Sequence, residues 1–284
     1  NRELKTESVK YIGSKKKILP NILELIGNCQ PETVLDLFSG STRISQALAK
    51  SGYRVIANDV SDLSRVLSTA YLLNSERPEH YFDLISHLNS VKPSHGWFSE
   101  IYGGQENGGS AIQEDGRKRI WQIHNTMKLD GVREEIERLN LDEVELAVAL
   151  TSLIIAMDKV DSSLGHQVAY LRNWASRSYQ NAFLEVPMLW PNTIQHSVLQ
   201  MDAFALLQER GISYDLAYLD PPYGSNNEKM PPSRVRYQAY YHLWTSVIRN
   251  DRPPVFGAAS RRDDSRDTVS ASVFEEYKKN PETN

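Results

Sequence analysis

The stretch from Leu216 to Tyr223 constrains the fold of this chain more than any other, because a short apolar run leads directly into Asp220, Pro221 and Pro222. Proline has no N–H group to donate, so two prolines in succession can continue neither a helix nor a sheet ladder. We therefore predict a strand that ends in a stiff corner. Ligands of open α/β sheets bind at the carboxyl ends of the strands, so this corner is predicted to face a binding site.

The chemistry of this corner suits the exocyclic amino group of a planar base. Asp220 supplies a carboxylate, and the prolines supply carbonyl oxygens without a competing N–H group. Tyr223 supplies a flat ring that can stack on the face of a base. An ordinary turn at the end of a strand would have the same sequence, so the rest of the chain must decide between the two interpretations.

A βαβ unit is predicted near the amino terminus. Residues 33–38 indicate a buried strand, residues 39–42 a turn of small residues, and the following residues a helix through Lys50. A second strand, residues 54–59, ends in Asp59, about twenty residues after the first turn, where a carboxylate can bind a ribose. The alternative is that Asp59 only caps the strand. A complete GxGxxG pattern is missing, which disfavours a nicotinamide cofactor.

The segment from Tyr11 to Lys17 precedes an amphipathic stretch with apolar residues at helical spacing. We predict Ser14 as the N-cap of this helix, and Gly13 lets the backbone approach a neighbouring group closely. Free N–H groups at a helix start favour an anion. The lysines at positions 15–17 could equally form a solvated basic face.

The middle of the chain differs in character. Residues 75–190 contain two predicted helices, 128–140 and 142–158, and basic residues among aromatic ones. Such a mixture suits phosphates and unstacked bases, although surface arginines beside packed aromatics would look the same. The candidate nucleic-acid-binding residues are Arg117, Lys118, Arg119, Arg172 and Arg177, followed downstream by Arg234 and Arg236. After this region we predict a strand that ends at Asp202 and a helix from Ala203.

Composition narrows the class of protein. The 284 residues are 40% hydrophobic and 24% charged, as in soluble globular proteins. One cysteine, Cys29, excludes an internal disulfide, and no Cys/His cluster has zinc spacing. We see no signal peptide and no apolar stretch long enough for a bilayer, so we expect a cytoplasmic protein that binds neither metal nor membrane. The net charge of -4 argues against a uniformly basic surface but allows a basic cleft.

Four segments together resemble the Dam-like (D12 class) adenine-specific DNA N6-methyltransferases. They are Tyr11 to Lys15, Asp36 to Ser41, Asp202 to Phe204, and Asp220 to Tyr223, with a long insertion between the second and third. The resemblance implies an α/β fold, with a Rossmann-like S-adenosylmethionine-dependent methyltransferase sheet formed by residues 1–74 and 191–284. Residues 75–190 would form an inserted, largely helical target-recognition region.

The resemblance also implies S-adenosylmethionine as methyl donor and a flipped-out adenine in double-stranded DNA as acceptor, with a cognate restriction endonuclease as a possible partner. The cofactor-binding residues would be Tyr11, Gly13, Ser14, Lys15, Asp36, Phe38, Ser39, Gly40, Ser41, Thr42, Asp59, Asp202 and Ala203. Asp220 and the carbonyl of Pro221 would accept hydrogen bonds from the target amino group, Pro222 would stiffen the corner, and Tyr223 would stack on the base.

Two features depart from the family pattern: Thr42 replaces the usual glycine, and few apolar strands follow Tyr223. An RNA adenine methyltransferase would use the same corner and cofactor. Protein glutamine methyltransferases usually have a sequence similar to Asn-Pro-Pro-Tyr at this place. The aspartate at position 220 therefore argues against that class. A third alternative is a DNA-binding module that binds the cofactor without turnover.

Overall fold

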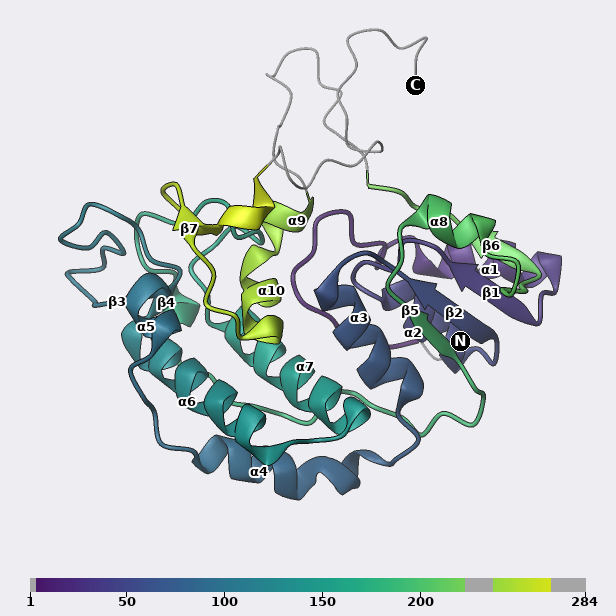
Figure 1. Cartoon of the computed structure of the whole chain (residues 1–284), viewed down its shortest axis with the longest axis horizontal. Coiled ribbons are helices and arrows are strands. Elements are labelled where there is room, and N and C mark those ends of the chain that lie inside the picture. The colour runs from purple at the N-terminus through teal and green to yellow at the C-terminus, as the bar shows by residue number, and fades with distance from the viewer. Residues whose placement is uncertain (1–3, 223–236, 267–284) are drawn as a thin grey trace, which may run out of the picture.

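The computed structural model describes residues 4–222 and 237–266 of the chain. Its centre is a sheet of four strands in the order β5-β2-β1-β6, and every neighbouring pair is parallel. The strands are β1 (Thr33–Asp36), β2 (Arg54–Asn58), β5 (Ser197–Leu199) and β6 (Leu216–Tyr218). The predicted α/β fold with a parallel sheet is therefore confirmed (Figure 1).

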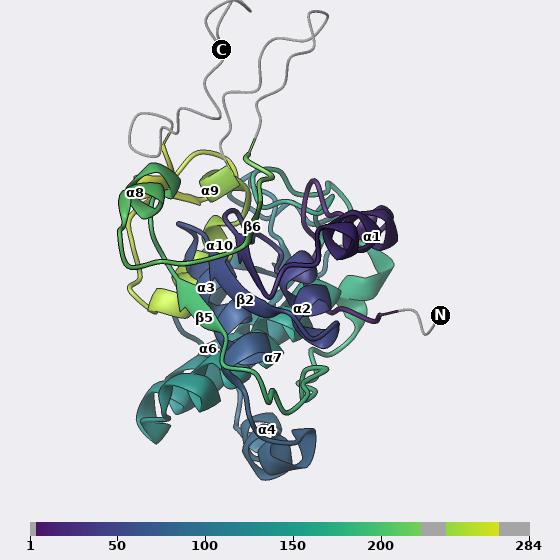
Figure 2. The same ribbon diagram turned by 90° about the vertical axis from the view of Figure 1, so that its right-hand side faces the viewer.

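Alternating side chains of the strands pack against helices on the two faces of the sheet. Val34 and Val55 lie in one apolar cluster with α1 (Leu19–Cys29) and α2 (Arg43–Lys50). Leu35 and Ile56 lie in another cluster with α8 (Ala203–Gln208). Because both faces are buried, the strands are almost continuously apolar, as is typical of parallel sheets. Figure 2 shows α1 and α2 on one side of the sheet and α8 on the other.

Most of the other described residues form a helical half beside the sheet (Figure 1). Its helices are α4 (Phe82–Ser90), α5 (Trp97–Tyr102), α6 (Ile123–Leu139), α7 (Glu143–Lys159), α9 (Tyr237–Tyr240) and α10 (His242–Arg249). Helix α3 (Asp62–Ser68), continued by the π-helical turn Thr69–Leu73, contacts both α7 and α10. The short elements are Pro78–Tyr81, β3 (Gly103–Gly104), β4 (Trp121–Gln122), Ser176–Tyr179, β7 (Val255–Phe256), β8 (Arg261–Arg262) and Asp263–Ser265.

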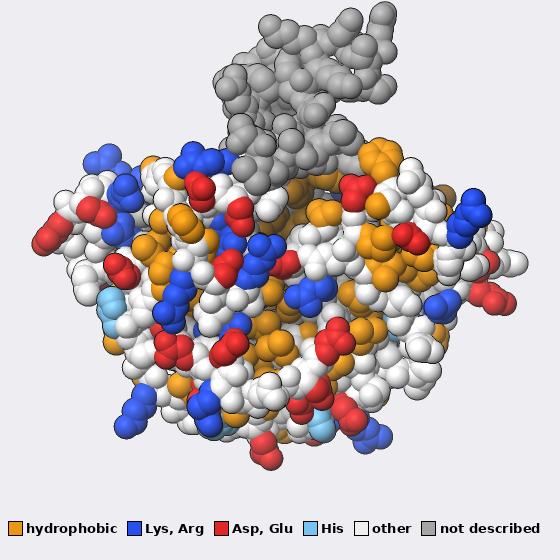
Figure 3. Space-filling view, in the orientation of Figure 1, with side chains coloured by type: hydrophobic (Ala, Val, Ile, Leu, Met, Phe, Trp, Pro, Cys, Tyr) orange, Lys and Arg blue, Asp and Glu red, His pale blue; other side chains and the backbone are white. Residues whose placement is uncertain are grey.

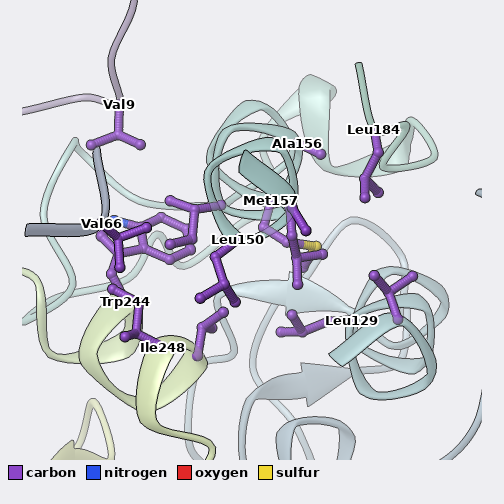
Figure 4. Packing of buried hydrophobic residues seen from close by; sticks show 14 of the residues in the cluster. Val9, Val66, Leu129, Leu150, Ala156, Met157, Leu184, Trp244 and Ile248 are labelled. Carbon is purple, nitrogen blue, oxygen red and sulfur yellow. The ribbon is translucent and has the colours of Figure 1, made fainter. Parts of the chain in front are cut away.

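The largest apolar cluster joins the helical half to α3. Val66 of α3, Leu150 and Met157 of α7, and Trp244 of α10 belong to this one cluster (Figure 4). Helix α10, which follows the Asp-Pro-Pro corner in sequence, thus packs against the region that we predicted as an insertion. The division into residues 1–74 with 191–284 and residues 75–190 stays a prediction.

Most predicted elements are present, but the predicted cap of the first helix is wrong. Helix α1 begins at Leu19, and its N-cap is Ile18, which makes no side-chain hydrogen bond. The N–H group of Ser14 instead donates to the carbonyl of Tyr11 in a turn. Pro20 lies in the first turn of α1, where its missing N–H group costs no hydrogen bond, and this favours the later start.

The two long helices and the strands β5 and β6 are present as predicted, but β5 ends at Leu199, three residues before the predicted end at Asp202. Helix α6 begins at Ile123, five residues before the predicted start, because the polar residues of its first turn hide the apolar periodicity. Helix α8 begins at Ala203 as predicted, and Asp202 is its N-cap. After Pro222, the only strands among the described residues are the two-residue strands β7 and β8. None of the described helices has the length and hydropathy needed to span a membrane.

A buried carboxylate on α6 fixes the start of α5. Asp130 accepts hydrogen bonds from the backbone N–H groups of Gly96, Phe98 and Ser99 at 2.8–3.0 Å, and from the Ser99 hydroxyl at 2.6 Å. It is only 5% exposed, so water cannot replace it. Side-chain acceptance of the free N–H groups at a helix start stabilises the helix.

We predict that Asp130→Ala lowers the free energy of unfolding by about 3 kcal/mol, because it leaves several buried donors without an acceptor. Urea denaturation measures this change. The matched control is Asp83→Ala, which removes an exposed carboxylate from α4 and should cost less than about 1 kcal/mol. Equal losses in the two variants would contradict the capping role.

Candidate functional site

A cavity of about 490 Å³ lies where the carboxyl ends of the strands meet α9 and α10. It is lined by most of the residues that the sequence predicted as a site, namely Tyr11, Gly13, Lys15, Asp36, Phe38, Ser39, Gly40, Ser41, Asp59, Asp202, Ala203, Asp220, Pro221 and Pro222. Ser14 and Thr42 are adjacent in sequence but do not line it. Tyr223, Arg234 and Arg236 lie outside the described residues.

The turn after β1 forms one wall of the cavity. Gly40 has a φ of 47°, and a Cβ atom there would lie 3.2 Å from the hydroxyl oxygen of Tyr11. Only glycine therefore combines this backbone conformation with the close approach of the ring. The N–H and hydroxyl groups of Ser39 both donate to the carbonyl of Asn58, at 2.8 and 3.0 Å, which ties the turn to the end of β2.

Asp59 follows β2 and is held by two backbone donors. Its Oδ2 accepts from the N–H group of Gly40 and its Oδ1 from that of Ser61, both at 2.9 Å. Burial raises the pKa of the Asp59 carboxyl, while these backbone hydrogen bonds lower it. Each carboxylate oxygen can accept more than one hydrogen bond, so a fixed carboxylate of this kind suits a pair of ligand hydroxyl groups.

Thr42, where the resembling family has glycine, is in the left-handed conformation with a φ of 64°. This conformation is unusual for a β-branched residue and explains why glycine is the usual choice. Thr42 is fully buried, and its hydroxyl accepts a hydrogen bond from Nε2 of Gln46 at 2.9 Å. Gln46 also bonds the backbone of Glu7 in both directions. The backbone at Thr42 is therefore strained, while its hydroxyl group links the turn through Gln46 to the amino-terminal segment.

Sequence reasoning missed Asn58, which joins the ends of three segments. Its Nδ2 donates to the carbonyls of Leu37 and Met201, each at 3.1 Å, and its Oδ1 accepts from the N–H group of Met201 at 3.0 Å. The side chain is buried, and every one of these bonds lies at the rim of the cavity. The available signal was a polar residue at the end of an otherwise apolar strand.

The Asp-Pro-Pro corner brings Asp220 to an ion pair with the amino-terminal segment. Nζ of Lys15 lies 2.9 Å from Oδ2 of Asp220 and donates to the carbonyl of Gly13 at 3.1 Å. The Lys15 and Asp220 side chains are 19% and 28% exposed, so both remain accessible from the cavity. The ion pair joins residues about 200 positions apart and could not be derived from local pattern.

Tyrosines of α9 and the α9–α10 junction form the opposite wall. The ring of Tyr241 stacks on that of Tyr11, with centroids 4.4 Å apart and an interplanar angle of 8°. Its hydroxyl accepts from the N–H group of Ile12 at 2.6 Å. Burial raises the pKa of Tyr241, so it stays a neutral phenol. Tyr237 and Tyr241 both line the cavity and were not among the predicted site residues.

Asp36 ends β1 in a fully enclosed position. Its Oδ2 accepts from the Ser45 hydroxyl at 2.6 Å. Burial raises the pKa of the Asp36 carboxyl to about 7, and the nearby charges of Asp59 and Asp220 raise it further against the Ser45 hydrogen bond. Five carboxyl groups line the cavity together with Lys15, Arg43 and Arg249, so its wall offers a ligand both acidic and basic side chains.

The five predicted nucleic-acid-binding residues that the structure describes do not line the cavity. Arg119 pairs with Asp115 at 2.7 Å and Arg177 with Asp161 at 3.0 Å, so these two guanidinium groups also serve the fold. The side chains of Arg117, Lys118 and Arg172 are exposed. Figure 3 shows acidic and basic side chains interspersed over one face. Contact with nucleic acid stays a prediction for all five.

The described residues contain no group of three or more His, Cys, Asp or Glu side chains arranged to hold a metal ion. The described side chains that line the cavity therefore offer carboxylates, hydroxyl groups, amides, tyrosines, one lysine and two arginines. Many of these side chains belong to the four segments on which the resemblance was based. The comparison with known proteins agrees with that resemblance.

The model of the "D12 class N6 adenine-specific DNA methyltransferase" family matches residues 11–280. The chain belongs to this family. It is 29% identical to "Modification methylase StsI" of Streptococcus sanguinis, over 88% of this chain and 37% of that protein. It is also 29% identical to "Modification methylase LlaI" of Lactococcus lactis subsp. lactis, over 89% of this chain and 40% of that protein.

A shorter relative is covered more fully. "Type II methyltransferase M.NlaIII" of Neisseria lactamica is 29% identical over 90% of this chain and 74% of that protein. The chain spans about two fifths of the length of the two longer relatives. The predicted family is thus confirmed, and methyltransferases of this family generally use S-adenosylmethionine.

The raised pKa of Asp36 predicts a pH-dependent effect of Asp36→Asn. Between the ordinary carboxyl pKa of 3.8 and about 7, the unfolded chain releases this proton and the folded chain keeps it. Stability therefore falls as pH rises through this window and levels off above it. The asparagine cannot ionise and can still accept from Ser45.

The free energy of unfolding of Asp36→Asn, relative to the unchanged chain, should rise by a few kcal/mol from about pH 4 to pH 7 and then stay constant. Urea denaturation at several pH values measures this difference. The carboxyl of Asp158, whose pKa burial also raises to about 7, is present in both proteins and cancels. A difference that does not change with pH would refute the assignment.

Proposed function

We propose that this chain transfers the methyl group of S-adenosylmethionine to the N6 amino group of an adenine flipped out of duplex DNA. The observation that carries the proposal is that Asp220, Pro221 and Pro222 share one cavity with the turn at Gly40 and with Asp59. The names of the relatives support a role as the modification enzyme of a restriction-modification system, with a restriction endonuclease as its counterpart.

The residues around the turn suit the proposed cofactor. Gly40 keeps the backbone open at its tight contact with Tyr11, and Asp59 holds two carboxylate oxygens in place for the hydroxyl groups of a ribose. Oδ1 of Asp202 caps α8 by accepting from two N–H groups, which leaves Oδ2 as the acceptor for an adenine amino group. S-adenosylmethionine, when bound, supplies an electrophilic methyl group on a sulfonium.

The corner after β6 suits the amino group of the target. An adenine amino nitrogen is a weak nucleophile because its lone pair is delocalised into the ring. Lys15 occupies Oδ2 of Asp220, so Oδ1 and the carbonyl of Pro221 are the acceptors for the two amino hydrogens. Pro221 and Pro222 bring no N–H group of their own that could compete.

These acceptors would activate the nitrogen by position and electrostatics. In the reaction a bond forms between N6 and the methyl carbon, the bond between that carbon and sulfur breaks, and the nitrogen loses one proton. Oδ1 of Asp220 is the base that would take this proton. The stacked rings of Tyr11 and Tyr241 close one wall of the cavity and limit the access of water.

The deciding experiment is transfer of a labelled methyl group from S-adenosylmethionine to unmethylated genomic DNA, with RNA and protein as parallel substrates. Nucleoside analysis that finds N6-methyladenine in DNA supports the proposal. Label in RNA or protein would replace the substrate and keep the chemistry of the site. No label, with the cofactor still bound, would instead identify a binding module without turnover.

We predict that Asp220→Ala lowers kcat for methyl transfer to DNA by at least about 100-fold, because it removes the charged acceptor beside the amino group. Binding of S-adenosylmethionine, measured by calorimetry, should change little. Asp83→Ala, an exposed carboxylate of α4, is the matched control and should keep full activity. Normal turnover by Asp220→Ala would refute its role.

A further inference from the structure

A turn between α7 and residue 171 presents a leucine to solvent. Leu164 is 75% exposed, the highest value among the large hydrophobic side chains that the structure describes. Single exposed apolar residues are common on protein surfaces and need no function. The case for Leu164 therefore depends on how firmly its turn is held and on where the turn lies.

Charged side chains hold the turn in place. Asp161 is 2% exposed, and its Oδ1 lies 2.6 Å from Nζ of Lys10 and 3.0 Å from Nη2 of Arg177. Its Oδ2 accepts from the hydroxyl of Ser163 at 2.8 Å. Arg177 also donates to the carbonyl of Ser163 at 2.6 Å. The residue directly before Leu164 is thus fixed through both its side chain and its backbone.

The backbone around Leu164 forms a short hairpin. Ser163 bridges antiparallel to Tyr170, and the N–H group of Leu171 donates to the carbonyl of Ser162 at 2.9 Å. Gly165 has a φ of 99°, which allows the tight reversal directly after Leu164. An exposed leucine on a firm hairpin keeps one direction, whereas on a loose loop it would fold back onto apolar surface.

Both sides of this hairpin contact residues that directly precede or lie between cavity-lining residues. A Cβ atom on Gly165 would lie 3.9 Å from Cβ of Lys10, which directly precedes the cavity-lining Tyr11. On the other side, the N–H group of Gln167 donates to the carbonyl of Tyr240 at 2.8 Å. Tyr240 lies between two further cavity-lining tyrosines, 237 and 241. Leu164 is therefore presented at the rim of the catalytic cavity.

Gln167 fixes the hairpin to α10 as well. Its carbonyl accepts from Nε2 of the buried His242 at 2.9 Å, and its Oε1 accepts from the N–H group of Leu243 at 2.7 Å.

Two cationic side chains beside the turn are partly exposed: those of Lys10 and Arg177 are 36% and 38% exposed. An apolar tip flanked by cations matches a base stack flanked by phosphates.

We propose that Leu164 enters the duplex where the target adenine leaves it and fills the gap in the base stack. This inference rests on the proposed function, because an adenine can reach Asp220 only after it has left the stack. Apolar side chains inserted between bases offset part of the lost stacking in other DNA-binding proteins. Leu164 acts here as a positioning residue and takes no part in the chemistry.

The test compares Leu164→Ala with Leu25→Ala and Leu164→Phe. Leu25 is a matched control, since it is 67% exposed and lies on α1, which packs against the sheet away from the hairpin of Leu164. The methylated site is first mapped on DNA amplified in vitro, and two oligonucleotide duplexes are then made around it. One duplex is fully paired, and the other has an abasic site opposite the target adenine, which lowers the cost of extrusion.

We expect Leu164→Ala to lower kcat/KM on the paired duplex by about tenfold or more, and by less than about threefold on the abasic duplex. With 2-aminopurine in place of the target adenine, its fluorescence on binding should fall in Leu164→Ala. Leu164→Phe and Leu25→Ala should stay within about threefold of the unchanged chain. Thermal unfolding and cofactor binding should be unaffected in all three.

The outcomes are separable. If the unchanged chain makes no N6-methyladenine in duplex DNA, both the proposed function and the wedge fail. If it does, and Leu164→Ala behaves like Leu25→Ala on the paired duplex, only the wedge is overturned. Equal losses on the paired and abasic duplexes would show a structural role for Leu164, which also overturns the wedge.

Discussion

Parallel pairing of β1 with β2 and β6 is the constraint on which the rest of the site depends. The register places Asp36 beside Ala57 on one side and Tyr218 on the other, so the polar residues that follow these strands emerge at one edge. Strand ends in a parallel sheet all point the same way, and the connecting helices must return on the faces. Residues that are far apart in sequence therefore meet without any special contact between them.

Several carboxyl groups lie around the cavity, and the repulsion between their negative charges is reduced in three ways. Asp36 is buried with a raised pKa, so it need not be charged in the free protein. Burial raises the pKa of Asp59, and the backbone N–H groups that donate to its carboxylate oppose this shift. Asp220 is paired with Lys15. Three different environments thus let three acids lie around one cavity, each suited to a different task.

The cavity is closed by segments from both ends of the described chain. The amino-terminal residues supply Tyr11 and Lys15, and the α9–α10 junction supplies Tyr241, which stacks on Tyr11. The hairpin at Leu164 lies against both segments and is fixed by the buried carboxylate of Asp161. The inserted region therefore contributes to the architecture of the rim as well as to any reading of DNA sequence.

Local sequence signals identified the strands, the turn after β1 and the Asp-Pro-Pro corner, because each depends on residues close together in the chain. The apolar runs of β1 and β6 and the proline pair at 221–222 exclude other local conformations. The start of α1 was misplaced because the cap geometry depends on a turn at Tyr11 that periodicity does not describe.

The sequence by itself determined the family and the parallel α/β sheet, and most of the site residues that it predicted line the cavity. Only the tertiary structure decided that Lys15 pairs with Asp220, that Asn58 joins three segments, and that Tyr241 forms the opposite wall. These contacts link positions tens to hundreds of residues apart. Their partners are chosen by the packing of whole elements, which no pattern of neighbouring residues encodes.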